Sequence, residues 1–146
     1  MPKKYKIRTG EAADEQWIFG LFRRTMQHYI DEAWGWDEII QREGFLTSLP
    51  INQFRFIEAQ GHQVGGFHIS EKPDHLVLDM ILVEPAQQRQ GWGSLMAIEI
   101  KQIAAAKQKP VRLSVLKTNP AIDFHVRIGF EEIEEDEHSI KMLLSV

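Results

Sequence analysis

The stretch EPAQQRQGWGSLM, residues 84–96, joins an apolar segment to a helix-forming one, and its layout decides how the surrounding chain is interpreted. Before it, HLVLDMILV at residues 75–83 is apolar at nearly every position, which predicts a strand covered on both faces. Pro85 then ends the strand ladder, because proline has no N–H to donate. Gly91 and Gly93 stand where the next helix begins.

Two interpretations of this turn are open. Glycines let backbone N–H groups close around an anion with no Cβ in the way. The helix N-terminus adds roughly half a positive charge, and Gln88, Arg89 and Gln90 add side-chain donors, which together favour a phosphate or pyrophosphate. The alternative is a tight turn in which glycine serves geometry alone. The spacing matches neither the three-glycine dinucleotide fingerprint nor the P-loop.

The composition limits the classes of protein that the chain can belong to. Its 146 residues contain no evident linker, which predicts one domain over residues 1–146. A net charge of −4 argues against general binding to nucleic acid, which needs a basic face. No apolar run is long enough to cross a membrane, and no secretory signal is evident, so we expect a cytoplasmic protein. The lack of cysteine excludes disulfides, thiolate metal sites and a cysteine nucleophile.

The remaining segments predict strands and helices in mixed order. Apolar spacing indicates helices at residues 14–30 and 34–46, a third after the glycines and a fourth, short one near residues 120–128. Strands are expected at residues 5–10, 52–59, 63–70, 75–83, 110–117, 129–133 and 139–144. Hairpins mixed with crossover helices indicate an α+β fold: a single mixed, largely antiparallel sheet with helices on both faces.

Finer details of the helices can also be predicted. In the third helix one apolar face combines Met96, Ile100, Ile103 and Ala104, widened by Leu95 and Ile98. The fourth helix is bracketed by Asn119 as N-cap, Pro120 at the first helical position and Gly129 just past the end. The acidic run at residues 131–137 is interpreted as a solvated hairpin turn.

Two stretches together resemble a known family. The first, VEPAQQRQGWG at residues 83–93, resembles the acetyl-CoA signature of GNAT-type N-acetyltransferases, in the form Gln88-x-x-Gly91-x-Gly93. The second, LSVLKTNPAIDFHVRIGF at residues 113–130, looks like the family's second signature, from Asn-Pro-Ala to Gly-Phe. The order of elements is similar as well, and GWDEIIQ at residues 35–41 resembles one bacterial branch. The resemblance covers essentially the whole chain and is strongest over residues 76–130.

The resemblance implies where acetyl-CoA, the expected co-substrate, binds. Its pyrophosphate is expected on the loop and first helical turn formed by Gln88, Arg89, Gln90, Gly91, Trp92, Gly93 and Ser94. Its pantetheine arm is expected beside Ile81, Leu82 and Val83, where a main-chain N–H would hold the thioester carbonyl. Asn119 is expected to reach the pantetheine, to cap the helix, or both. Phe124, in the second signature, is also assigned to the cofactor site.

The resemblance also implies a reaction, acyl transfer to a primary amine. With no cysteine, an acyl-cysteine intermediate is impossible, and direct attack in a ternary complex is the simplest course. The family usually has tyrosine as proton donor to the departing thiolate, whereas this chain has His125. An imidazole can donate a hydrogen bond whether neutral or charged, so His125 either takes that role or is an ordinary polar residue near the sheet.

Other polar and aromatic residues admit two interpretations each. Asp79, the single charged residue inside its apolar strand, is either a catalytic base or part of a structural ion pair or a bulge. Aromatic and acidic side chains around the first two helices either hold a cationic amine or belong to the core and the helix ends; they are Tyr29, Asp31, Glu32, Trp34 and Trp36. No metal site is expected, because His62, His68 and His75 lack ligand spacing.

The sequence therefore predicts an acetyl-CoA-dependent N-acetyltransferase acting on an amine of a small molecule or a peptide. The alternative is a non-catalytic acyl-CoA-binding or regulatory module, which the histidine in place of tyrosine keeps open. The chain is expected to be a monomer or a homodimer, with neither nucleic acid nor membrane as partner.

Overall fold

The computed structural model describes residues 4–146 and contains eleven regular elements in the predicted order. Along the chain they are β1 (Lys6–Thr9), α1 (Glu15–Trp34), α2 (Glu38–Ser48), β2 (Phe54–Ala59), β3 (His62–Glu71), β4 (Leu76–Val83), α3 (Trp92–Lys107), β5 (Val111–Leu116), α4 (Ile122–Arg127), β6 (Glu131–Glu135) and β7 (Ser139–Leu144). Short 3₁₀ turns precede α1, β2 and the glycine loop.

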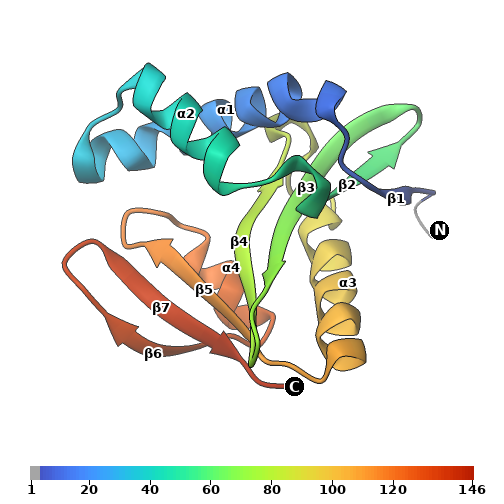
Figure 1. Ribbon diagram of the computed structural model, residues 1–146, viewed down its shortest axis with the longest axis vertical. Helices are drawn as coiled ribbons and strands as arrows, with labels where there is room; N and C mark the ends of the chain where they lie inside the picture. Colours follow the sequence, from blue (N-terminus) through green and yellow to red (C-terminus); the bar gives the residue numbers. More distant parts are fainter. Residues whose placement is uncertain (1–3) are drawn as a thin grey trace.

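The strands form one seven-stranded sheet in the order β1-β2-β3-β4-β5-β7-β6. All neighbouring pairs within it are antiparallel except β4 and β5. Helices α1 and α2 lie across one face, and α3 lies along the other (Figure 1). Two buried apolar clusters result, one between the sheet and α3 and one between the sheet, α1 and α2. The predicted fold class is confirmed.

Strands β4 and β5 separate soon after they meet. They pair only at Leu76 with Val111 and at Val77 with Arg112, and beyond these positions the two strands diverge (Figure 1). On its other side β4 stays paired with β3 over its whole length, with one irregularity where Asp79 and Met80 stand opposite His68. Such a β-bulge bends a strand and increases its twist. The sheet is thereby opened between its two parallel strands.

Local sequence signals account for several element ends. The β2–β3 hairpin turns at Gln60 and Gly61, whose φ angles are 54° and 79°, as expected for a two-residue turn of the type that matches strand twist. α1 continues to Trp34, beyond the predicted end, and stops at Gly35 with φ of 87°. Asp37 caps α2 by accepting a hydrogen bond from the Ile40 N–H at 3.0 Å.

Three expectations are corrected. α4 begins at Ile122 and not at Pro120, because Pro120 and Ala121 form a turn before the helix. Ile98 does not widen the buried face of α3, since it points outward and is 54% exposed. β4 is covered only in part, because its middle residues border the opening left by β5 and are half-buried.

Candidate functional site

The glycine loop leads from the end of β4 into the first turn of α3. Arg89 and Gly91 both take left-handed backbone conformations, with φ of 64° and 88°, and these fold the chain back before the helix starts. The first helical bond runs from the Leu95 N–H to the Gly91 carbonyl at 3.1 Å. The N–H groups of Gly93 and Ser94 precede that bond and have no acceptor within the helix. They form a cradle of donors at the positive end of the helix.

The side chains of this loop divide into two groups. Gln88 donates from Nε2 to the Val83 carbonyl at 3.1 Å, and so holds the loop against the end of β4. Trp92 is only 5% exposed and packs edge-on against Tyr5, which anchors the start of α3 in the core. Arg89, Gln90 and Ser94 are exposed, and their side chains are accessible to a ligand.

The loop is also tied to the opposite face of the sheet. Arg24 of α1 donates from Nε and Nη2 to the two carboxylate oxygens of Glu84, at 3.2 and 2.7 Å. This bidentate pair has directional strength beyond that of a single contact. It connects α1 to the residue that follows β4, and therefore fixes where the glycine loop begins.

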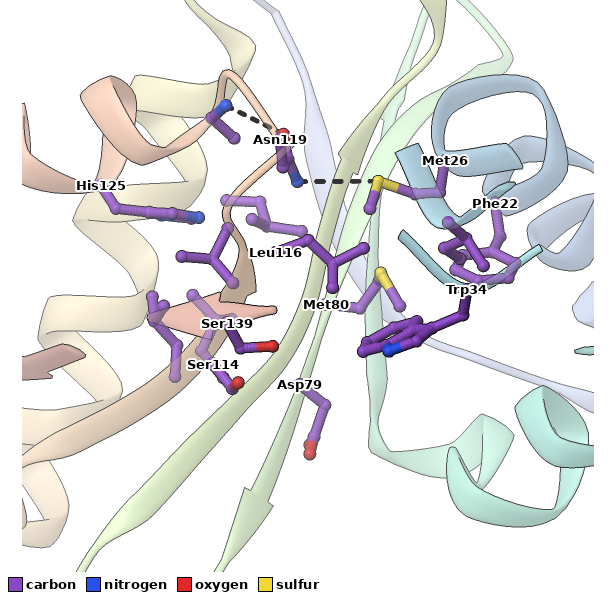
Figure 2. Close-up of a pocket in the computed structure, with 16 residues that line it drawn as sticks. Phe22, Met26, Trp34, Asp79, Met80, Ser114, Leu116, Asn119, His125 and Ser139 are labelled. Atoms are coloured by element: carbon purple, nitrogen blue, oxygen red, sulfur yellow. Dashed lines mark hydrogen bonds between the residues drawn. The ribbon is translucent and has the colours of Figure 1, made fainter. Parts of the chain in front are cut away.

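A pocket of about 300 Å³ lies where β4 and β5 separate, and α1 covers one side of it (Figure 2). Its walls are mainly apolar, among them Phe22, Met26, Met80, Ile81 and Leu116. A few polar side chains reach it: Asp79, Ser114, Asn119, His125 and Ser139. An apolar cavity with a few convergent polar groups is typical of a small-molecule site.

His125 reaches the pocket from α4. Its side chain is 5% exposed, and its Nδ1 has no hydrogen-bond partner among residues 4–146. Burial lowers the pKa of His125 to about 4, because the charged form loses its hydration. The imidazole is therefore neutral near pH 7, and it carries one N–H donor and one acceptor nitrogen. A buried polar atom without a partner is uncommon and fits a group that awaits a ligand.

Asn119 is not the N-cap that the sequence predicts, because Ala121 takes the cap position of α4 and no side chain caps that helix. Its Oδ1 accepts a hydrogen bond from the Ala121 N–H at 2.9 Å and so organises the turn before α4. Its Nδ2 points across the pocket toward the Met26 sulfur, 3.8 Å away (Figure 2). A thioether is a weak acceptor, so this amide can exchange Met26 for a better partner.

Both structural interpretations of Asp79 hold, because it lies at a bulge and pairs with a histidine. It lies at the bulge of β4, and its Oδ2 is 2.8 Å from His68 Nδ1 and accepts a hydrogen bond from Ser70 Oγ at 2.9 Å. Asp79 also lines the pocket. Sequence reasoning missed His68. The signal was present, because counting back from the turn at residues 72–75 places His68 opposite Asp79 in an antiparallel hairpin.

Of the five residues proposed for the acceptor amine, the structure brings Trp34 to the pocket, while Asp31 accepts a hydrogen bond from the Trp36 N–H at 3.0 Å. Trp36 instead packs on Phe22 and donates from Nε1 to Glu38 at 2.9 Å. Tyr29 is half-buried against the α1 cluster, and Glu32 points outward, 58% exposed. Three residues were expected beside the pantetheine arm. Of these, Ile81 lines the pocket, Leu82 is buried between the sheet and α1, and Val83 is half-buried.

Residues 4–146 lack two kinds of feature. No group of three or more histidine, aspartate or glutamate side chains is placed to hold a metal ion there. No helix in that part of the chain is long and apolar enough to span a bilayer.

The chain belongs to the GNAT acetyltransferase family, since the model of the acetyltransferase (GNAT) domain matches residues 50–132. No match was found among curated proteins. Among solved structures, the PaiA N-acetyltransferase of Thermoplasma acidophilum in complex with coenzyme A superposes with a TM-score of 0.83 at 16% identity, covering 98% of this chain and 99% of that one.

Two other solved structures are similar. The ribosomal-protein-S18-alanine N-acetyltransferase of Escherichia coli has a TM-score of 0.74 at 21% identity, with 98% of this chain and 96% of that one covered. Ard1 of Thermoplasma volcanium has a TM-score of 0.71 at 15% identity, with 97% and 99% covered. At these identities the likeness concerns the fold.

Proposed function

We propose that the protein is an N-acetyltransferase that moves an acetyl group from acetyl-CoA to a primary amine by direct attack. The observation that carries this proposal is the opening between β4 and β5, which holds an apolar pocket that His125 enters, while the donor cradle at the start of α3 follows the end of β4. A long, thin co-substrate with an anionic middle and an acyl end matches that layout.

The residues present fit coenzyme A. The N–H groups of Gly93 and Ser94 suit its pyrophosphate, with Arg89 and Gln90 exposed beside them. Beyond Val77, the backbone groups of β4 that face β5 lack a strand partner. They suit the amides of a pantetheine arm, which can add itself to the strand in the manner of an extended peptide. The complex of PaiA with coenzyme A supports this assignment by fold.

The chemistry requires one bond to form and one to break. The amine nitrogen, as the neutral base, bonds to the acetyl carbon, the carbon–sulfur bond breaks, and one proton from the nitrogen ends on the sulfur. Holding both reactants in one cleft supplies much of the rate. A neutral His125 can donate a hydrogen bond to the departing thiolate, and a backbone N–H near Ile81 can hold the carbonyl oxygen.

The acceptor belongs to the primary amines, of a small molecule or a peptide. Trp34 and the apolar pocket wall suit the carbon chain that carries the amine. A screen of amines with acetyl-CoA tests the proposal. It measures the release of free coenzyme A thiol and the mass of the product. Acetylation of at least one amine supports it. A protein that binds acetyl-CoA but acetylates none is the non-catalytic module, and that result would contradict the proposal.

A further inference from the structure

The bulge in β4 places a buried histidine behind the carboxylate at the pocket. Asp79 and Met80 together stand opposite His68 of β3, and this arrangement turns the Asp79 side chain toward both the histidine and the pocket. His68 itself is 1% exposed, and its ring lies edge-on to Phe54 at 4.6 Å between centroids. The pair is therefore dry on the histidine side and open to the pocket on the aspartate side, whose side chain is 23% exposed.

Both ring nitrogens of His68 face acceptors. Nδ1 is 2.8 Å from Asp79 Oδ2, and Nε2 is 3.1 Å from the Pro50 carbonyl oxygen. A carbonyl only accepts, so Nε2 must carry a proton. A second proton must lie between Nδ1 and Oδ2, because two lone pairs at that distance repel. Ser70 donates to the same Oδ2 at 2.9 Å. Two donors on one oxygen favour the carboxylate, which makes His68 an imidazolium and the pair neutral.

The second oxygen of Asp79 is available to a ligand. Oδ1 has no hydrogen-bond partner among the side chains and backbone of residues 4–146, while Oδ2 holds two. In Figure 2, Asp79 lies at the bottom of the drawn group, with Asn119 at the top, His125 at the left and Trp34 at the right. A carboxylate oxygen here can accept N–H groups of an amine whose carbon chain contacts Trp34.

We propose that His68 is a positioning residue that holds Asp79 as a hydrogen-bond acceptor for the amine of the acetyl acceptor, so that Asp79 orients this amine and does not deprotonate it. The reason is charge. A further proton on Asp79 would leave the buried imidazolium without a counter-ion, at a high cost in free energy. This inference rests on the proposed function, and it assigns the acceptor end of the pocket to Asp79 and Trp34 and the thiol end to His125.

Kinetics of variants separate orientation from base catalysis. With the best acceptor from the screen, Asp79→Asn should raise the KM for the amine about tenfold, while kcat and the KM for acetyl-CoA stay within about threefold of wild type, since a hydrogen bond to a charged group is worth about 1.4 kcal/mol or more. His68→Gln should raise the KM for the amine in the same way. His62→Gln, on the exposed start of the same strand, is the matched control and should leave every constant unchanged.

A spectroscopic measurement does not depend on turnover. Nitrogen NMR of the imidazoles in the wild-type protein near pH 7 should show His68 with both nitrogens protonated, and Asp79→Asn should return one of them to the unprotonated form. A wild-type His68 with an unprotonated nitrogen would overturn the inference, as would an Asp79→Asn variant whose kcat falls with an unchanged KM. If no amine is acetylated, the proposed function fails, and the role of Asp79 toward the acceptor amine fails with it. The NMR spectrum still shows whether both nitrogens of His68 are protonated.

Discussion

Gly93 lies directly against the ring of Phe124: a Cβ at position 93 would be 3.2 Å from two of its ring carbons. This contact joins the first turn of α3 to α4, and so joins the two sequence stretches that resemble the family's signatures. Position 93 therefore requires glycine because of this contact, whereas position 91 favours glycine because of its φ of 88°. The contact also places Phe124 as the packing surface behind the donor cradle.

The contact between Gly93 and Phe124 predicts a stability effect that a second change removes. Gly93→Val should lower the free energy of unfolding by about 1–3 kcal/mol, because the added carbons meet a ring that has to shift. Adding Phe124→Ala should make the effect of the valine much smaller, as a double-mutant cycle measured by urea unfolding would show. A double variant whose loss of stability equals the sum of the two single losses would mean that the two residues do not interact.

Ser94 offers a test of the donor cradle that avoids backbone strain. Ser94 is exposed in the first turn of α3, where an added carboxylate interacts favourably with the helix dipole but repels a pyrophosphate. Ser94→Glu should therefore fold with stability equal to or above wild type and lose most of the rise in melting temperature that acetyl-CoA causes. Ser94→Ala is the control and should keep that rise. An undiminished shift in Ser94→Glu would place the pyrophosphate elsewhere.

His125 is expected to affect catalysis more than cofactor binding. His125→Phe should lower kcat at least about tenfold, on the order of 1.4 kcal/mol in the barrier, because the thiolate loses its hydrogen-bond donor. His125→Tyr should keep much of the activity. Steady-state kinetics and calorimetry with acetyl-CoA separate the two effects. Wild-type turnover in His125→Phe, with chemistry rate-limiting, would make His125 a bystander and leave the proton to a bound water.

The buried His125 also predicts a pH dependence of stability. Burial lowers its pKa from 6.5 to about 4, so between these values the unfolded chain takes up a proton that the folded chain does not. Stability should therefore fall as the pH drops from about 6.5 to about 4, by on the order of 3 kcal/mol from this residue. Urea unfolding across that range should show a shallower decline in His125→Phe. The exposed His62→Phe should decline as wild type does, and a parallel decline in all three proteins would contradict the assignment.

Much of the fold could be predicted because its signals are local. The order of elements follows from apolar spacing, and the glycine loop could be identified because Gly91 and Gly93 stand between an apolar strand and a helix-forming segment. The pairing of His68 with Asp79 was missed because it lies across a hairpin. Counting back from the turn at residues 72–75 points to it, whereas the bulge that brings Met80 opposite His68 has no local signal. Asp79 looked isolated in its own strand, yet its partners lie on the neighbouring one.

The direction in which side chains point was harder to predict than the elements that carry them. Trp92 lies in the glycine motif, but the first turn of α3 rotates its ring into the core beside Tyr5. Trp34 and Trp36 are two positions apart, and the end of α1 between them sends one to the pocket and the other onto Phe22. The middle of β4 is half-buried because β5 stops pairing with it after Val77. Where that pairing stops depends on contacts between residues far apart in the sequence.

A crystal structure of the protein with coenzyme A tests the central claim most directly, namely that the opening between β4 and β5 is the acyl-transfer site. The pyrophosphate is expected against the N–H groups of Gly93 and Ser94, the pantetheine arm between the two strands, and the sulfur in the pocket beside His125. Coenzyme A bound at another surface, with the opening left free, would contradict this claim.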